Sequence, residues 1–311
     1  MGDVIISTSI IKQIINYHKN KDCYLITDHL YENIFSGWNG LSVHPLNRNS
    51  LMDLVGAACW IRKNRFSRVY DLQSNDKTRL LCAVSGIRGK IGNHPIYPYN
   101  IHPDTVYRKD YHPYLRLQET ARVAGIPVTS EIPYLLINNK DADHVKKWLI
   151  DNQLTEKKFV LLHAGASPTH PEKCWPWYNL LANKLVQSGL GVVWTGTKNE
   201  HEKTRMLMEN TGVNACGEFN IVELAELGKH AAFAVTNDSG PMHVLSASGI
   251  PVYALFGPTN PRVHHAIGQE KNVISARVSS AENENFIKTP IDAISVEQVV
   301  NRITADGLIN K

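Results

Sequence analysis

The chain has 311 residues, of which 43% are apolar and 20% charged, and its formal net charge is +4 at pH 7. This length suits two domains of about 150 residues each. No apolar run approaches the roughly 18 residues of a membrane span, and no secretory signal is visible at the start. Five cysteines are scattered without a Cys-x-x-Cys pair, which argues against a disulfide framework or a zinc site and favours a cytosolic protein.

The charge is unevenly distributed along the chain. Residues 1–140 carry 17 Lys and Arg against 11 Asp and Glu, whereas the remainder carries 16 against 18. A basic first half suits an anionic partner, such as a charged lipid surface or a phosphorylated sugar, although it also fits a merely solvated surface. Nucleic acid is not expected, because no recognised motif and no basic stretch with interleaved aromatic residues is present.

The first half alternates helical and strand patterns. Apolar spacing, caps and breakers predict helices over 3–18, 51–64, 76–86 and 114–124, and strands over 22–28 and 68–73. A long irregular stretch separates the last two helices. Residues 125–158 are expected to form the passage between two domains, residues 1–140 and 155–311.

The second half alternates more regularly. Continuous apolar runs predict strands over 159–165, 190–196, 213–217, 231–237 and 251–257, and the segments between them have helical patterns. Such strands indicate a parallel sheet covered by helices on both faces. We therefore expect an α/β protein with two doubly wound domains, which bind ligands at the carboxyl ends of their strands.

Small, polar and capping residues follow four of these strands, in the stretches HAGASP, TGTKNE, NDSGPMH and GPTNP. In NDSGPMH, Asp238 or Ser239 can cap the next helix. The backbone N–H groups of Ser239, Gly240 and Met242 could then bind a phosphate or diphosphate, with His243 as a further donor. The alternatives are an ordinary helix cap and a buried histidine bonded to the backbone.

Two charged residues are candidates for the same site. Lys173 precedes the helix after the first strand of this half and could reach a diphosphate, or it could be a surface lysine. Glu200 follows the strand ending in VVWTG and could bind sugar or ribose hydroxyls, or cap a helix.

Several other site classes are not supported. The chain has no GxGxxG after a strand, no GxxxxGK[ST] and no GxSxG. The DAD at 141–143 resembles a metal-binding DxD, but it opens a polar helix, so we predict no metal there.

Four stretches together resemble the bacterial glycosyltransferase family 9, whose best-known members are the lipopolysaccharide heptosyltransferases. They are TNDSGPMHVLSASGIPVYALFGPTNP, EKCWPWYNLLANKL, DLQSNDKTRLL and GDVIISTSIIKQI, and they occur in the family's order over nearly the whole chain. The resemblance implies a GT-B fold: two Rossmann-like doubly wound domains facing a central cleft, with the acceptor on residues 1–140 and the nucleotide sugar on residues 155–311.

The implied reaction is metal-independent transfer, with inversion, of heptose from ADP-heptose to the lipopolysaccharide inner core. It would take place in the cytoplasm, at the inner face of the inner membrane, with no cofactor besides the nucleotide-sugar donor. Alternatives are a family 9 transferase with another nucleotide sugar, an epimerase of the same fold, or a catalytically inactive protein that binds sugar nucleotides or lipopolysaccharide.

The resemblance also implies residue roles. Asp3, of the opening Gly-Asp motif, matches the general base, which must reach the acceptor hydroxyl. Donor-binding roles fall on the residues Lys173, Glu200, Phe219, Asp238, Ser239, Gly240, Met242 and His243.

The basic first half would bind the acceptor, with Arg62, Lys63, Lys77 and Arg79 as the main candidates and Arg65 and Arg68 beside them. The family also has a short apolar strand about ten residues before the Gly-Asp motif, which this sequence lacks. We expect the strands that would flank it to be left without a partner.

Overall fold

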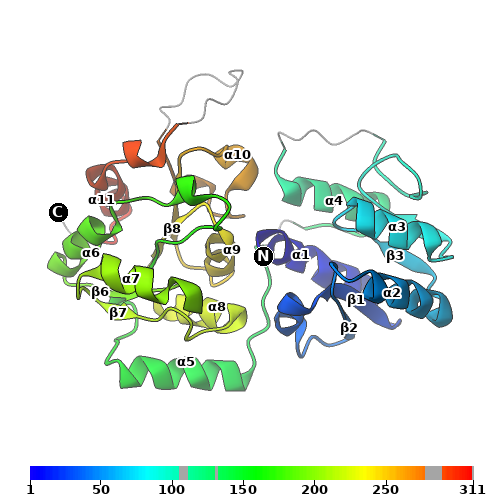
Figure 1. Cartoon of the computed structure of the whole chain (residues 1–311), viewed down its shortest axis with the longest axis horizontal. Coiled ribbons are helices and arrows are strands. Elements are labelled where there is room, and N and C mark those ends of the chain that lie inside the picture. The colour runs from blue at the N-terminus through cyan, green and yellow to red at the C-terminus, as the bar shows by residue number, and fades with distance from the viewer. Residues whose placement is uncertain (105–110, 130–131, 277–288, 310–311) are drawn as a thin grey trace. The chain divides into compact units, whose positions relative to one another are not determined.

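We describe a computed structural model of the chain, which covers residues 1–104, 111–129, 132–276 and 289–309 (Figure 1). The chain divides into two compact units, Asp3–Leu136 and Ile137–Lys311, which are described separately.

The first unit has the predicted alternation of helices and strands. Its helices are α1 (Gly2–Tyr17), η1 (His29–Phe35), α2 (Leu51–Asn64), α3 (Asp76–Val84) and α4 (Pro113–Val123). Its strands are β1 (Cys23–Asp28), β2 (Leu41–Leu46), β3 (Arg68–Tyr70) and β4 (Gly89–Ile91). The five helices and strands predicted up to residue 86 and the helix at 114–124 are all present.

The strands of this unit form two separate parallel pairs. β1 pairs with β2 in the register Cys23↔Leu41, and β3 pairs with β4 in the register Arg68↔Gly89. Among the described strands of this unit, each has one partner, so each keeps one open edge. A cavity of about 680 Å³ runs along β1 and β3 and is floored by isoleucines of α1, among them Ile6 and Ile11.

The second unit is built on one sheet of parallel strands in the order β10-β9-β8-β5-β6-β7. The strands are β5 (Phe159–His163), β6 (Gly191–Trp194), β7 (Val213–Asn214), β8 (Ala234–Asn237), β9 (Val252–Phe256) and β10 (Val273–Ser275). The α-helices are α5 (Asn139–Asp151), α6 (Tyr178–Gln187), α7 (His201–Met208), α8 (Ile221–His230), α9 (Gly240–Ser246), α10 (Pro261–His264) and α11 (Val296–Ala305).

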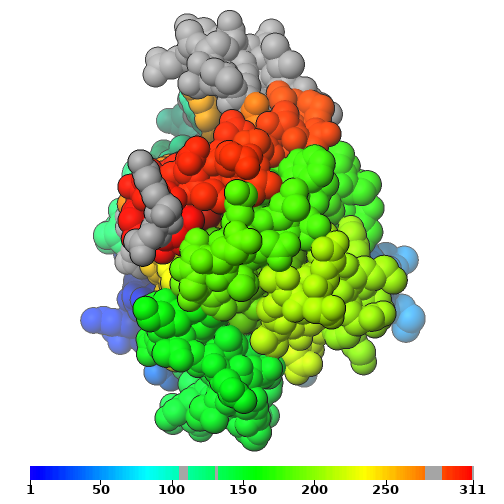
Figure 2. Space-filling model, turned by 90° about the vertical axis from the view of Figure 1, so that its left-hand side faces the viewer, coloured from blue at the N-terminus to red at the C-terminus, as the bar shows by residue number. Residues whose placement is uncertain are grey.

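The core of this unit lies on both faces of the sheet. On one face Val160 and Leu162 of β5 pack with Trp175 and the residues of α6 and α11. Figure 2 shows this outer surface, where the green segment carrying α6 borders the red segment carrying α11. On the other face Phe159 and Leu161 pack under α5, α8 and α9. The continuous apolar strands are therefore buried on both sides, as predicted.

The boundary between the units lies earlier than predicted. The division falls after Leu136, so α5, which the sequence analysis assigned to the passage between domains, belongs to the second unit. Val145 and Leu149 of α5 are buried in its core, and this packing fixes the helix to the sheet. The DAD stretch lies near the start of α5, with Asp141 in the first turn, where its negative charge favours the helix start.

Candidate functional site

The carboxyl edge of the second sheet is organised by Asn237, the last residue of β8. Its side chain is fully buried and makes four hydrogen bonds. Nδ2 donates to the carbonyl oxygens of Ala164 and Gly165, both at 3.0 Å. Oδ1 accepts from the Trp175 N–H at 3.2 Å and from the Tyr178 hydroxyl at 3.3 Å. One amide therefore ties together the loop after β5, the segment after Lys173 and the start of α6.

The Asn237→Ala variant is expected to destabilise the second unit by about 3 kcal/mol, because buried partners would lose their hydrogen bonds. Urea unfolding measured with fluorescence of the buried tryptophans tests this. Asn301→Ala, at an exposed position of α11, is the matched control and should change stability by less than about 0.5 kcal/mol. Equal stability of the two variants would show that Asn237 does not hold the edge together.

Lys173 and Asp238, both predicted from the sequence, lie together at this edge. Lys173 Nζ is 2.7 Å from Asp238 Oδ2, and the Thr259 hydroxyl donates to the same oxygen at 2.7 Å. The side chains of Lys173 and Asp238 are 18% and 8% exposed. Lys173 ends the short 3-10 helix η2 (Pro171–Lys173), and Thr259 follows β9. The ammonium group has three donors, so it can bind an anion while it remains paired with Asp238.

The turn before α9 differs from the prediction. Neither Asp238 nor Ser239 caps the helix with its side chain, because the Asp238 carboxylate is paired with Lys173 and the Ser239 hydroxyl contacts His163. The Met242 N–H bonds to the Ser239 carbonyl, so it is not a free donor for an anion. Met242 and His243 are both buried, and Met242 packs in the core. Since α9 has only seven residues, its N-terminus contributes less to anion binding than the sequence suggested.

Glu200 lies at the end of the 3-10 helix η3 (Lys198–Glu200). Its Oε2 accepts hydrogen bonds of 2.7 Å from both the N–H and the hydroxyl of Thr197, so the helix-capping alternative is correct for this oxygen. Oε1 lies against Gly165, where an added Cβ would approach it to 1.7 Å. A larger residue at position 165 would therefore have to displace the Glu200 side chain, and Glu200 Oε1 borders the loop after β5.

Phe219 lies at the end of the loop before α8. Its ring contacts Trp148 of α5 edge to face, with centroids 5.1 Å apart, and it packs on the core. The structure therefore gives Phe219 a packing role, and its predicted role near the base remains a prediction.

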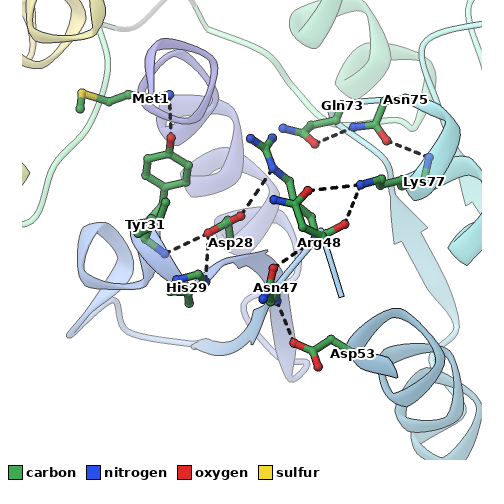
Figure 3. Close-up of polar contacts among 12 residues, drawn as sticks. Met1, Asp28, His29, Tyr31, Asn47, Arg48, Asp53, Gln73, Asn75 and Lys77 are labelled. Atoms are coloured by element: carbon green, nitrogen blue, oxygen red, sulfur yellow. Dashed lines mark hydrogen bonds and ion pairs between the residues drawn. The ribbon is translucent and has the colours of Figure 1, made fainter. Parts of the chain in front are cut away.

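The carboxyl edge of the first unit carries a second polar cluster, shown in Figure 3. Asp28 ends β1, Arg48 follows β2, and Lys77 lies in the first turn of α3. Lys77 Nζ is 2.7 Å from the Arg48 carbonyl oxygen, and Arg48 Nε is 3.6 Å from Asp28 Oδ2. Asp3, in the exposed first turn of α1, borders the same cavity as these three residues.

The predicted acceptor residues do not all lie at this edge. Lys77 does, whereas the Arg79 guanidinium pairs with Asp76 at 3.3 Å. Arg62 and Lys63 lie in the last turn of α2, which leads into the start of β3. The start of a strand is the edge opposite to its carboxyl end, so these two residues are removed from the candidate set. Arg48 was missed because β2 contains Pro45 and was not identified as a strand.

The folds of both units match those of GT-B glycosyltransferases. A glycosyl transferase family 9 structure from Veillonella parvula superposes with a TM-score of 0.82 and 20% identity, covering 98% of this chain and 93% of that one. The E. coli ADP-heptose lps heptosyltransferase II gives a TM-score of 0.75 and 19% identity, covering 98% and 95%. The protein is thus an α/β protein with the GT-B fold, as predicted.

The family follows from the sequence. The model of glycosyltransferase family 9 (heptosyltransferase) matches residues 60–289, and the chain belongs to this family. It is 29% identical to lipooligosaccharide heptosyltransferase 2 of Haemophilus influenzae over 48% of this chain and 45% of that protein. It is 27% identical to lipopolysaccharide heptosyltransferase 2 of E. coli K12 over 69% of this chain and 66% of that one. The matches thus span under two thirds of these relatives.

Among the described residues, no helix is long and apolar enough to cross a membrane.

Proposed function

We propose that the protein is an inverting glycosyltransferase that moves heptose from ADP-heptose to the lipopolysaccharide inner core. The observation that carries the proposal is the partly buried cluster of Lys173, Asp238 and Thr259 at the carboxyl edge of the second sheet. Family membership and the names of the relatives support the heptosyl group and the lipopolysaccharide acceptor.

The proposed step is a direct displacement at the anomeric carbon of the donor. An acceptor hydroxyl oxygen forms the new bond to this carbon while its bond to the diphosphate oxygen breaks. ADP leaves with the electron pair of that bond, and Asp3 takes the proton of the hydroxyl. Asp3 is exposed in the first turn of α1 and borders the cavity of the first unit, so an acceptor hydroxyl can reach its carboxylate.

The second unit would bind the donor. Lys173 neutralises charge that develops on the leaving diphosphate, while Asp238, which accepts a hydrogen bond from Thr259, holds the ammonium in position. Glu200 Oε1 is placed to accept hydrogen bonds from donor hydroxyls, because its other oxygen is occupied by Thr197. Lys173 would supply the positive charge that a metal ion supplies in other transferases. Transfer should therefore proceed at an unchanged rate in excess EDTA.

The first unit would bind the anionic acceptor through Arg48 and Lys77. Both cations lie at the edge where β1, β2 and β3 end, and Asp3 borders the same cavity. The Arg48 side chain is 61% exposed, so its guanidinium can exchange its long contact with Asp28 for a phosphate or carboxylate. Contact with the anionic inner face of the inner membrane is part of the same proposal.

Arg48→Gln is expected to raise the KM for the acceptor about tenfold with little change in kcat, because one charge-assisted contact is lost. Initial rates over a range of acceptor concentrations measure this effect, which should shrink at high salt. Arg62→Gln, at the opposite edge of the unit, removes the same charge and should leave the KM unchanged. A similar rise in both variants would mean that only the overall positive charge matters.

The function itself is tested by mixing the protein with ADP-heptose and heptose-deficient lipopolysaccharide. Release of ADP together with growth of the lipid by one heptose supports the proposal. Binding of ADP-heptose without release of ADP would favour a binding protein. Transfer from a different nucleotide sugar would mean that this sugar nucleotide, and not ADP-heptose, is the donor.

A further inference from the structure

His163 is a buried titratable residue at the candidate donor site to which neither the sequence analysis nor the proposed function gives a role. It is the last residue of β5, and its side chain is 3% exposed. In the sheet it pairs in register with Thr236 of β8. Because strand side chains alternate, its ring lies on the same face as Phe159 and Leu161, the face covered by α9.

One edge of the His163 ring contacts the turn that follows β8. Nδ1 is 3.3 Å from Ser239 Oγ, and this hydroxyl is also 3.3 Å from the Asn237 carbonyl oxygen. A carbonyl oxygen only accepts, so the single hydroxyl hydrogen of Ser239 goes to Asn237. Ser239 Oγ then accepts from the ring, which fixes a hydrogen on Nδ1 and leaves Nε2 as the nitrogen that can take up a second proton.

The Glu200 carboxylate lies near the Cε1 edge of the same ring. A Cβ added at Gly165 would lie 1.7 Å from Glu200 Oε1 and 3.3 Å from His163 Cε1, so both groups flank this one glycine. The negative charge of Glu200 raises the pKa of His163. Burial lowers it by more, so the net pKa is below the ordinary value of 6.5 and the ring is neutral at pH 7.

The other ionisable groups of this site do not add a net charge that would shift the pKa of His163 further. Lys173 and Asp238 neutralise each other at 2.7 Å, and burial raises the pKa of the Cys216 thiol beside Glu200, which keeps it uncharged. His243 of α9 is a second buried imidazole at this edge. Glu200 is therefore a negative charge close to a neutral imidazole.

We propose that His163 is a positioning residue that takes up one proton when the diphosphate of the donor binds at Lys173. This inference rests on the proposed function, because it takes the ligand to be a nucleoside diphosphate. The added negative charge favours the imidazolium, which keeps its Nδ1–H bond to Ser239, gains a proton on Nε2 and offsets the charge of Glu200. The ring would thereby link the anion-binding part of the site to the hydroxyl-binding part.

The sign of the pH dependence follows from this linkage. The complex binds one more proton than the free protein, so the affinity for the diphosphate falls as pH rises above the lowered pKa of His163. The effect should reach up to tenfold per pH unit while the ring is neutral in the free protein and protonated in the complex.

Calorimetric titration with ADP in two buffers of different ionisation enthalpy, at pH 7, measures the proton uptake directly. The wild-type chain should take up about 0.5 to 1 proton per ADP. His163→Asn keeps a donor at the position of Nδ1 but cannot titrate, and it should bind ADP with uptake close to zero. His230→Asn, at the far end of α8, is the matched control and should behave like the wild type.

Each outcome of these titrations either supports or overturns the proposed role of His163. Binding of ADP by the wild type without uptake, or unchanged uptake in His163→Asn, would overturn the role of His163 and leave the proposed function intact. Absence of ADP binding by the wild type would overturn both. If the asparagine variant does not fold, the wild-type uptake and the affinity of the wild type between pH 6 and 8 still decide, because a flat profile contradicts the inference.

Discussion

The Asp3→Asn variant is expected to lose about 10²–10⁴-fold in kcat while the protein still binds the donor. An amide has nearly the shape of a carboxylate but cannot accept the proton of the acceptor hydroxyl, so only the chemical step is affected. Asp3 is exposed in the first turn of α1, and the exchange leaves the apolar face of this helix unaltered. Rates of ADP release at saturating substrates, together with calorimetric affinity for ADP, separate turnover from binding.

Asp143→Asn is the matched control for this prediction. It makes the same chemical change at another exposed carboxylate near the start of a helix, α5 of the second unit. The control should keep wild-type turnover. If Asp3→Asn also retains turnover, another group is the base and the carry-over of this role from the family is wrong.

Replacing Lys173 by methionine is the second change with a large expected effect. The leaving diphosphate would lose its cation, and kcat should fall by about 10²–10³-fold. The buried Asp238 carboxylate would keep the Thr259 hydroxyl as a partner but lose its counter-charge, which should also destabilise the second unit. Turnover with ADP-heptose and urea unfolding measure the two effects.

The double variant Lys173→Met with Asp238→Asn distinguishes these two effects. Removing both charges should recover most of the lost stability, because no unpaired charge is left buried, but turnover should stay low. Lys184→Met, at a 48% exposed lysine of α6, is the control for loss of one positive charge. Full turnover of the Lys173→Met variant would contradict the assignment of the cluster to the leaving group.

The predictability of the fold depended on the length of each strand and on its apolar pattern. The strands β5, β8 and β9 are fully buried strands of four or five residues that are mostly apolar or follow an apolar stretch, and each was identified from the sequence. In the first unit β2 was missed because proline and histidine interrupt it, and β4 was missed because Ile91 is the one large apolar residue among its three. The helix α11 also went unnoticed, although Ser295 and Gln298 form a capping box at its start.

Residues of the candidate site could be predicted from the sequence where their charge and their position after a strand were sufficient to identify them. Lys173 and Asp238 were both named, but their direct pairing could not be foreseen because they are 65 positions apart. Thr259 and Asn237 stand in the stretches that follow β9 and end β8, yet nothing in their local sequence reveals which side chains they bond. His163 has its role only through Ser239 and Glu200, which tertiary structure brings to it.

The measurement that tests the account most directly is ADP release from ADP-heptose in the presence of heptose-deficient lipopolysaccharide, with the mass of the lipid determined in parallel. The account predicts one heptose added to the lipid for each ADP released, at a rate that Asp3→Asn lowers by about 10²-fold or more. Release of ADP without growth of the lipid, or no release although ADP-heptose binds, would contradict it.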